Sequence, residues 1–529
     1  MAKVIHKGLY LILALFIGLF IASTFVVRAQ YNYAAYGDNP ILGSQQWGIF
    51  IPLLIVLSLA SVVMYRLCLK LNRFRPVVVI PVVLLASSAV QTAIIFWFPR
   101  VPTDDSQTVL SLAMDMLYDQ DYSSFDTTGY LHMFPFNYSI VLILKTLLYL
   151  FPDNYLVIKL FNILCTLVTT LMIYLIYKQL HAKSGGRDYG VLVLAATYLP
   201  ALFMNNLIYN DVIATALLTS SLYFLIRFLK EKTYKWVVAA AILLALGNDL
   251  RSIGAIVLIA AILCILLNIR SLGFQKFMIS IGVLALLFNV PGWTQKWALQ
   301  SVVNEPVGEN AAPVYMWLNM GINLERFGFW DNRESYAIYQ REANYNKAES
   351  TVLFKQEIER KLSEASAGDL VRMYTKKLIW TWTEGTYQMD RYGIGNGSSF
   401  GMGRGGGGID GSYSYATAAT DWFQGDSAPR IGILWVVYTM NVLIYVFVLV
   451  RLIGGIRAKR YDEVSLILVI LGFIGFYLLW EIKSRYLFPV YPLLLVLAYM
   501  GFKDAHDSIF RRKLGGERIS HGKGDSYAK

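Results

Sequence analysis

Two adjacent carboxylates, Asp104 and Asp105, head a segment in which apolar residues recur at helical spacing from Val109 to Leu117. A carboxylate at a helix start can cap the helix, but capping explains one aspartate and not the repulsion between two like charges. Pairs of this kind are typical of sites that move a proton or bind a ligand. We therefore predict that the pair takes part in catalysis or ligand binding. The acidic residues that follow are interpreted as a solvated face: Asp115, Asp119, Asp121 and Asp126.

Four cations stand where apolar runs end, namely Arg100, Arg251, Lys483 and Arg485. Ionisable groups at membrane depth are costly and mark ligand or ion pathways. Arginine and lysine bind phosphate oxygens by charge-assisted hydrogen bonds, so this group beside an apolar slot suits a lipid with a phosphate head. The alternative for each cation alone is a side chain that snorkels to the membrane interface. That alternative is weakest for Arg251 and Arg485, which interrupt the boundaries of closely connected apolar runs.

The composition places these residues in a membrane protein. Residues of the AVILMFWYC set make up 56% of the 529 positions and charged residues 16%, which exceeds the apolar content of soluble domains. The formal charge of +12 does not indicate a nucleic-acid partner, because the cations gather in short segments between apolar runs, where they orient membrane proteins. The cysteines lie inside apolar runs and have no metal-binding, redox or disulfide spacing. We interpret all of them as core residues: Cys68, Cys165 and Cys264.

Apolar runs of about 20 residues are the expected length of a membrane-spanning helix. The first run follows Lys3 and Lys7 and is interpreted as an uncleaved signal anchor. With the N-terminus inside, the connections rich in lysine and arginine all fall on the inner side, as the positive-inside rule requires. We predict an all-α polytopic membrane protein with about 12 transmembrane helices and cytoplasmic termini. The runs are 8–27, 47–69, 77–98, 155–178, 188–208, 211–229, 235–250, 252–269, 276–292, 431–451, 463–480 and 485–502.

This orientation leaves two large segments outside, 99–154 and 293–430. An apolar stretch from Asn137 to Phe151 carries Lys145 and is too short to cross comfortably. We predict that it lies along the outer interface as a juxtamembrane helix. Function is expected in these outer segments.

The second outer segment is longer than an ordinary connection and reads as a small, mainly helical cap. Amphipathic spacing from Ser335 to Trp382 predicts two helices. The glycine-rich stretch 393–412 is interpreted as a flexible linker, with a mobile lid as the alternative. The predicted organisation is three N-terminal transmembrane helices in 1–98, the first outer loop in 99–154, a six-helix core in 155–292, the cap in 293–430, three C-terminal helices in 431–502 and a basic cytoplasmic tail in 503–529.

In layout the chain resembles the C-type (GT-C) glycosyltransferase superfamily, whose members use polyprenyl-phosphate sugars and include protein O-mannosyltransferases and aminoarabinose transferases. Four motifs carry the resemblance, and their order and sidedness match. They are PRVPTDDSQTVLSLA with the acidic pair, GYLHMFPFNYSIVLILKTLLYLF at the interface, GNDLRSIGAIVLIAAIL with a basic residue entering a span, and EIKSRYLFPVYPLLLVLAYMG, which is similar to a Glu-x-x-x-Arg-Tyr-x-x-Pro segment.

The resemblance implies a role for each candidate residue. Asp104 would be the catalytic base, with Asp105 as its neighbour or a ligand of the acceptor. Arg251 and Arg485, assisted by Lys483 and Arg100, would hold the donor phosphate. His132, Tyr486 and Glu481 would contact substrate. No metal is required, and if a divalent cation does bridge carboxylate and phosphate, the acidic pair is the expected place for it.

The implied function is transfer of a sugar from a polyprenyl-phosphate donor, at the outer face of a cell membrane, to a surface polysaccharide, teichoic-type polymer, glycolipid or protein. Two departures stand against the family pattern: two spans precede the one that leads into the acidic loop, and the cap matches no soluble domain. The alternatives are a polysaccharide polymerase or ligase of the envelope and a lipid-linked-sugar transporter. A transporter would predict inverted repeats, which the sequence does not show.

Overall fold

The computed structural model is almost entirely helical in the residues that it describes. The paired strands in this part are β1 (Val27–Asn32) and β2 (Asn39–Ser44), which run antiparallel with Val27 opposite Ser44. The hairpin is a small departure from the predicted all-α class, which is otherwise confirmed. The described residues are 2–33, 38–152, 154–181, 186–303, 306–395, 413 and 415–520, with side chains up to 509.

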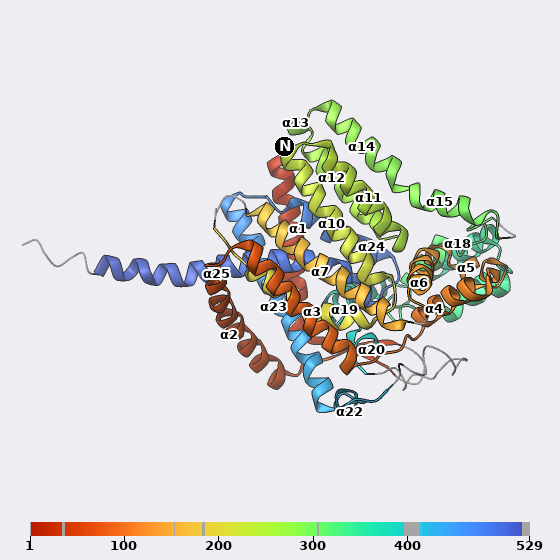
Figure 1. The fold of residues 1–529 in the computed structure, drawn as a ribbon, viewed down its shortest axis with the longest axis horizontal. Coiled ribbons are helices and arrows are strands. Elements are labelled where there is room, and N and C mark those ends of the chain that lie inside the picture. Colours follow the sequence, from red (N-terminus) through yellow and green to blue (C-terminus); the bar gives the residue numbers. More distant parts are fainter. Residues whose placement is uncertain are drawn as a thin grey trace, which may run out of the picture.

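Long apolar helices form the body of the molecule (Figure 1). In the described part, eight helical segments are long and apolar enough to cross a membrane. They contain α1 (Ala2–Thr24), α2 (Trp47–Leu71), α3 (Pro76–Trp97), α7 (Tyr155–Leu180), α10 (Asn210–Glu231), the successive helices α14 (Phe274–Phe288) and α15 (Val290–Leu299), α23 (Ala428–Ala458), and η7 (Ser484–Val490) followed by α25 (Tyr491–Ser520). Shorter helices fall on two further predicted spans and on the interfacial stretch: α12 (Gly254–Leu267), α24 (Val464–Leu479) and α6 (Tyr138–Leu150). The predicted span 235–250 coincides with α11 (Tyr234–Leu250).

The predicted span 188–208 is wrong as a single helix. It is broken into α8 (Gly190–Ala196), α9 (Leu199–Phe203) and the 3₁₀ turn η5 (Met204–Asn206). Pro200 has no backbone N–H to donate to the preceding turn, and its ring disfavours a helical conformation just before it. The break therefore follows from the sequence, and the number of 12 crossings stays a prediction.

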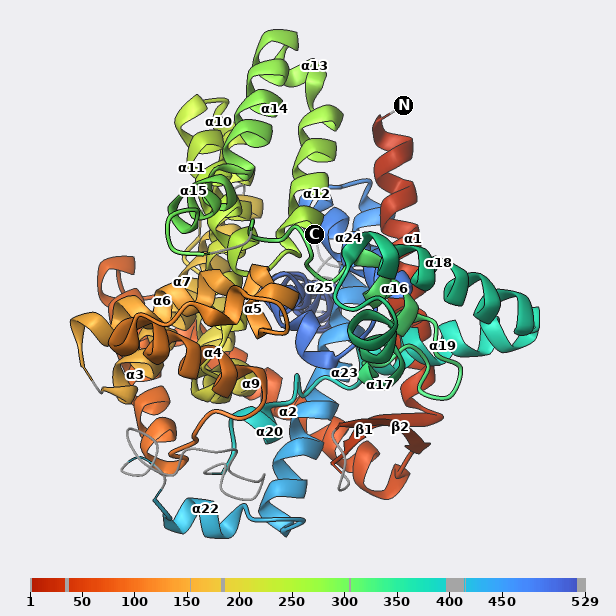
Figure 2. The ribbon, with the colours of Figure 1, turned by 90° about the vertical axis from the view of Figure 1, so that its right-hand side faces the viewer.

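Short helices from the two predicted outer segments gather at one end of the molecule. In Figure 1, α4, α5, α6 and α18 lie at the right-hand end, and Figure 2, which views this end, shows α4 to α6 on its left side and α16 to α19 on its right side. The first group contains α4 (Asp105–Met114), η1 (Asp115–Asp119), η2 (Ser123–Phe125), α5 (Tyr130–Met133) and η3 (Pro135–Asn137), followed by α6. The second contains α16 (Val314–Gly321), α17 (Asn332–Tyr336), η6 (Ala337–Glu342), α18 (Lys347–Glu364), α19 (Ala367–Thr383), α20 (Met389–Tyr392) and α22 (Ala418–Trp422). Elsewhere in the chain, the short helix α13 (Ile269–Leu272) connects α12 to α14.

The two helices predicted between Ser335 and Trp382 are α18 and α19. Both begin with a side-chain cap, because Asn346 and Ser366 accept hydrogen bonds from backbone N–H groups of the first turn. Most of the glycine-rich stretch, from 396 to 412, lies outside the described residues.

The long helices pack closely, and α25 crosses α23 at a point where only glycine fits. A Cβ at Gly501 would overlap the carbonyl oxygen of Phe447. At the far ends of these helices from Arg485, ion pairs join neighbouring elements. Arg451 binds Glu463 and Asp504, while Lys503 donates to Asp188.

The contact at Gly501 gives a test of this packing. We expect Gly501→Ala to lower the free energy of unfolding by about 2 kcal/mol, because the added methyl group forces the two backbones apart. The control is Gly475→Ala on α24, whose Cβ would meet no atom within 4 Å. The readout is the melting temperature in detergent followed by tryptophan fluorescence. Equal melting temperatures for the two variants would contradict the close crossing.

Candidate active site

A cavity of about 440 Å³ lies where the two groups of short helices meet the long helices. Its charged lining residues are Asp105, Arg251, Glu481 and Arg485. They come from four places in the chain: the start of α4, the end of α11, the loop after α24 and the turn η7. This first cavity thus brings together residues that the sequence singled out in three distant regions, around positions 105, 251 and 481–485. Its volume is in the usual range for small-molecule sites.

The two arginines of the first cavity share a buried carboxylate. Asp211, in the first turn of α10, is fully buried and forms an ion pair with Arg251. The Nε atom of Arg485 lies 3.9 Å from Oδ2 of the same Asp211. The two guanidinium groups face one buried carboxylate, which fixes their orientation. This arrangement suits an anionic ligand such as phosphate.

Aromatic rings hold the arginines from their other sides. The guanidinium carbon of Arg251 lies 5.1 Å from the ring centre of Tyr486. That of Arg485 lies 5.2 Å from Tyr209 and 5.0 Å from Tyr392. Cations over aromatic faces are stabilised there and lose little freedom when a ligand binds. The site is therefore organised before any ligand enters it.

A stack of aromatic residues forms another wall of the first cavity. Trp317 stacks on Trp480 with ring centres 5.6 Å apart, and Trp480 stacks in turn on Phe476 at 4.9 Å. Trp330 and Tyr336 complete this wall. Flat apolar surfaces beside a few fixed charges are the usual construction of a small-molecule site. Such a surface accepts the apolar face of a sugar ring or an isoprenoid chain.

Asp104, the first residue of the acidic pair, has an unusual backbone conformation. Asp104 is the N-cap of α4, with φ of 58° and ψ of −136°, and its side chain makes no capping hydrogen bond. Its Oδ2 instead accepts from Nε of Arg391 at 3.0 Å and from Nη2 at 2.7 Å. Non-glycine residues adopt such conformations at a cost of about 1–3 kcal/mol, and they cluster at functional sites. The side chain of Asp104 therefore does not cap helix α4. It forms an ion pair with Arg391, which belongs to the predicted outer cap.

Arg391 also contacts a second carboxylate, that of Asp38. Its Nη1 forms an ion pair with Asp38, which lies just before β2 in the hairpin. Gln388 Nε2 donates to Oδ2 of Asp38 at 2.7 Å. Burial favours the neutral form of Arg391, but Tyr392, Asp38 and Asp104 together raise its pKa. Arg391 therefore stays charged and holds the acidic pair to the hairpin.

A second cavity of about 300 Å³ adjoins the first. The two share Asp105, Trp330 and Tyr336. The remaining polar lining of the second cavity includes Asp104 and Lys483. Asp105 thus faces both spaces, with 46% of its side chain exposed and Arg485 Nη2 at 3.9 Å. A group bound in each cavity would meet at this carboxylate.

Two of the predicted residues line neither of these cavities. Arg100 is buried, and its Nη1 donates to the carbonyl of Ile394 at 3.0 Å. His132 is also buried, with Nδ1 at 3.3 Å from the carbonyl oxygen of Phe125. The structure thus gives both residues contacts with the protein backbone. Their roles toward phosphate and acceptor remain predictions.

Burial shifts the titration of two groups near the first cavity. It raises the pKa of Glu481 to about 7, although Lys483, Tyr486, Lys377 and Arg251 favour the ionised form. It lowers the pKa of Lys377 to about 7, and Glu481 opposes that change. Both groups therefore titrate near neutral pH, which is a property of functional sites.

Three functional residues were not singled out in the sequence: Asp38, Asp211 and Arg391. Asp211 could have been noticed as an acidic residue at the end of a predicted span, where it is as costly as the basic ones. Asp38 and Arg391 lie in connecting segments, and their importance depends on contacts 353 positions apart along the chain. No local sequence pattern indicates the contact between Asp38 and Arg391.

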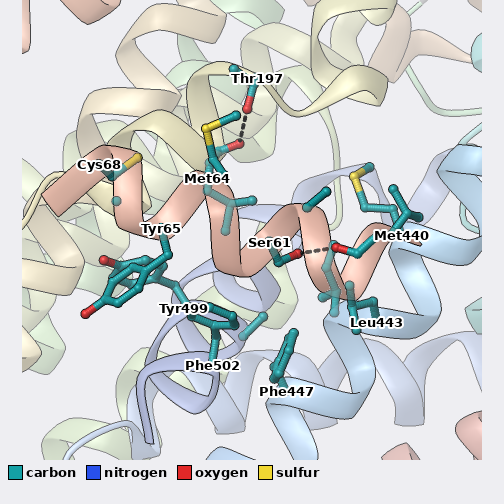
Figure 3. A pocket seen from close by; sticks show the side chains of 16 residues that line it. Ser61, Met64, Tyr65, Cys68, Thr197, Met440, Leu443, Phe447, Tyr499 and Phe502 are labelled. Atoms are coloured by element: carbon teal, nitrogen blue, oxygen red, sulfur yellow. Dashed lines mark hydrogen bonds between the residues drawn. The ribbon is translucent and has the colours of Figure 1, made fainter. Parts of the chain in front are cut away.

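A further cavity of about 230 Å³ lies elsewhere, between α2, α8, α23 and α25 (Figure 3). In Figure 3, Tyr65 of α2 lies beside Tyr499 and Phe502 of α25, whereas Met64 lies beside Thr197. Its lining contains no charged residue and shares none with the first two cavities. Its lining therefore lacks the fixed charges that mark the first two cavities.

The question of a metal ion is left open by this geometry. Among the described residues, no group of three or more histidine, cysteine, aspartate or glutamate side chains could hold one. Asp104 and Asp105 are two carboxylates with cations already beside them. The divalent cation that the resemblance allowed at this pair stays a prediction.

The comparison with known protein families covers part of this candidate site. Residues 139–294 match the family described as Dolichyl-phosphate-mannose-protein mannosyltransferase. The matched range runs from α6 to α15 and contains Asp211 and Arg251, but neither the acidic pair nor Arg485. A comparison with curated proteins gave no match.

Among solved structures, the chain is similar to the archaeal oligosaccharyltransferase AglB from Archaeoglobus fulgidus in complex with an inhibitory peptide and a dolichol-phosphate. The sequence identity is 11% and the TM-score 0.39, over 85% of this chain and 52% of that one, so the chain spans about half the length of AglB. The family match over residues 139–294 agrees with the predicted resemblance to the GT-C superfamily, and the eight long apolar helical segments of the described part agree with a multi-pass membrane protein.

Proposed function

We propose that the protein transfers a sugar from a polyprenyl-phosphate donor to an acceptor at the outer face of its membrane. The observation that carries the proposal is the shared wall at Asp105, where a cavity with two fixed arginines adjoins a second, polar cavity. The first would take the donor, with its phosphate at Arg251 and Arg485. The second would take the acceptor. The description of the matched family, a mannosyltransferase that uses a lipid phosphate, agrees with this donor class.

The reaction follows from these positions. A hydroxyl group of the acceptor loses its proton to a carboxylate, and its oxygen attacks the anomeric carbon of the donor sugar. The bond between that carbon and the phosphate oxygen breaks, and the electron pair leaves with the phosphate. Arg251 and Arg485 stabilise the charge that develops there. The products are the glycosylated acceptor, a polyprenyl phosphate and the proton held by the carboxylate.

Asp105 suits the role of the base better than Asp104, to which the family pattern assigns it. Asp104 Oδ2 already accepts two hydrogen bonds from Arg391, so this oxygen is occupied by the guanidinium group. Asp105 interacts with Arg485 at 3.9 Å and lines both cavities. We assign Asp104 to the positioning of its neighbour through Arg391.

The direct test is loss of a product. Mass spectrometry of envelope glycans from cells with wild-type protein and with Asp105→Asn should differ by one sugar on a polysaccharide, teichoic-type polymer, glycolipid or protein. The purified protein in nanodiscs should bind undecaprenyl phosphate. Identical glycans together with no binding of the lipid would refute the proposal.

The outward orientation has a separate test. The native cysteines are buried, so a cysteine introduced at a surface position supplies an accessible thiol. Ser363 is exposed at the end of α18, and Arg457 is exposed in the last turn of α23. A maleimide that cannot cross membranes should label Ser363→Cys on intact cells and label Arg457→Cys only after lysis. The reverse pattern would place the candidate site on the inner face.

A further inference from the structure

Glu481 is a buried carboxyl group with an unused hydrogen-bonding atom in the wall of the first cavity. The residue is 2% exposed and lies in the loop between α24 and η7. Its Oε2 has no hydrogen-bond partner among the described residues. Leaving a buried polar atom without a partner is costly, and more so when the group is charged. The protein keeps this group beside a cavity where a ligand can satisfy it.

The loop that carries Glu481 is fixed by the cap. Ile482 donates its N–H to the carbonyl of Gly328 at 3.0 Å and accepts from the N–H of Trp330 at 3.4 Å. Trp480, which directly precedes Glu481 in the chain, stacks on Trp317 of α16. Backbone and side-chain contacts thus hold the carboxyl group on both sides. Such a rigid support is what a binding group requires.

The nearby cations leave the free oxygen available. The ammonium group of Lys377 donates to the carbonyl of Gly321 at 2.8 Å. Lys483 lies over the ring of Trp330 at 5.2 Å and lines the second cavity. Arg251 is in an ion pair with Asp211. These groups favour an ionised Glu481 by their charge, and together with burial they leave its pKa near 7.

Glu481 lines the same cavity as the arginines and directly follows Trp480 of the aromatic wall in the chain. The arginines converge on Asp211 at the start of α10, whereas Glu481 stands next to the aromatic wall built from Trp317, Trp330 and Trp480. A ligand whose phosphate lies at the arginines would turn its other end toward this wall. In a polyprenyl-phosphate sugar the sugar is attached directly to the phosphate, so its ring is the group that reaches Glu481.

We propose that Glu481 is a specificity-determining residue that accepts hydrogen bonds from ring hydroxyl groups of the donor sugar while the tryptophans cover its apolar face. The inference rests on the proposed function and narrows its donor to a lipid phosphate carrying a hydroxyl-rich sugar. A site built to bond a hydroxyl group rejects ligands that lack it, because its own polar atom is then left unpaired.

The test separates the sugar from its lipid phosphate. Undecaprenyl phosphate is titrated into the full-length protein in nanodiscs, followed by undecaprenyl phosphate carrying mannose, glucose, galactose or N-acetylglucosamine. For the wild-type protein, we expect at least one lipid-linked sugar to bind more tightly than the bare lipid. Glu481→Gln should reduce this gain about tenfold and leave the affinity for the bare lipid within about twofold, because one charge-assisted hydrogen bond is lost.

Two further variants serve as controls. Glu325→Gln removes an exposed carboxylate elsewhere in the cap and should change neither affinity. Glu481→Asp keeps the charge but withdraws it by one methylene, so its gain should lie between those of the wild type and Glu481→Gln. Two results would overturn this inference alone. In one, Glu481→Gln binds every lipid-linked sugar with the same gain in affinity over the bare lipid as the wild type. In the other, Glu481→Gln weakens binding of the bare lipid as much as binding of the lipid-linked sugars. Wild-type protein that binds none of the lipids would overturn the proposed function as well.

Discussion

Replacement of Asp105 by asparagine is expected to slow sugar transfer by about 10³-fold, the size of effect that general-base catalysis supplies. Asparagine has the same shape but cannot take the proton of the acceptor hydroxyl. The carboxylate is 46% exposed and interacts with Arg485 at 3.9 Å, so its loss should disturb the fold little. The measurement is the rate of polyprenyl phosphate release from a radiolabelled lipid-linked sugar in the presence of an envelope fraction.

Two other aspartates are the controls for this experiment. Asp119→Asn, on the exposed face beyond α4, should leave the rate unchanged. Asp104→Asn should slow transfer by about tenfold, because Arg391 keeps its ion pair with Asp38 but loses one anchor at the acidic pair. If Asp104→Asn proved the more damaging variant, the base would be Asp104, as the family pattern implies.

The parts of the site that the sequence predicted are those with a local signal. Asp105, Arg251 and Arg485 are charges at the ends of apolar runs, where the cost of burial makes any ionisable group informative. Glu481 came instead from the resemblance to the Glu-x-x-x-Arg-Tyr-x-x-Pro segment, and the structure places it in the lining of the first cavity. The burial argument did not separate Asp105, Arg251 and Arg485 from Arg100, which stands at a similar boundary but donates to a backbone carbonyl.

The parts that were missed depend on long-range contacts. The hairpin β1–β2 is short and was hidden between two predicted spans, so nothing indicated that it carries Asp38 to Arg391. The break at Pro200 had a local signal, but the apolar composition around it outweighed that signal in the prediction. Composition reports how far a segment prefers lipid, whereas the path of the backbone also depends on which hydrogen bonds its residues can make.

Replacement of Arg485 by glutamine is expected to weaken the binding of undecaprenyl phosphate about 10- to 100-fold, which is the effect of losing one hydrogen bond to a charged group. Arg485 is 3% exposed and stands between Asp211 and the cavity. Its removal leaves Arg251 as the one guanidinium against Asp211 in this part of the described structure, so one of the two cations available to the phosphate is lost. Titration of the lipid into nanodiscs measures the effect.

A charge-balanced variant separates the loss of phosphate binding from a loss of folding. Arg485→Gln with Asp211→Asn removes one cation and one anion together, so the net charge of the site stays that of the wild type and Arg251 is released from its ion pair. We expect this double variant to regain most of the melting temperature lost by Arg485→Gln and part of the lipid affinity. Arg457→Gln, at the exposed end of α23, should change neither. If Arg485→Gln bound the lipid phosphate as tightly as the wild type, the arginines would be structural partners of Asp211 and the phosphate would have to bind elsewhere.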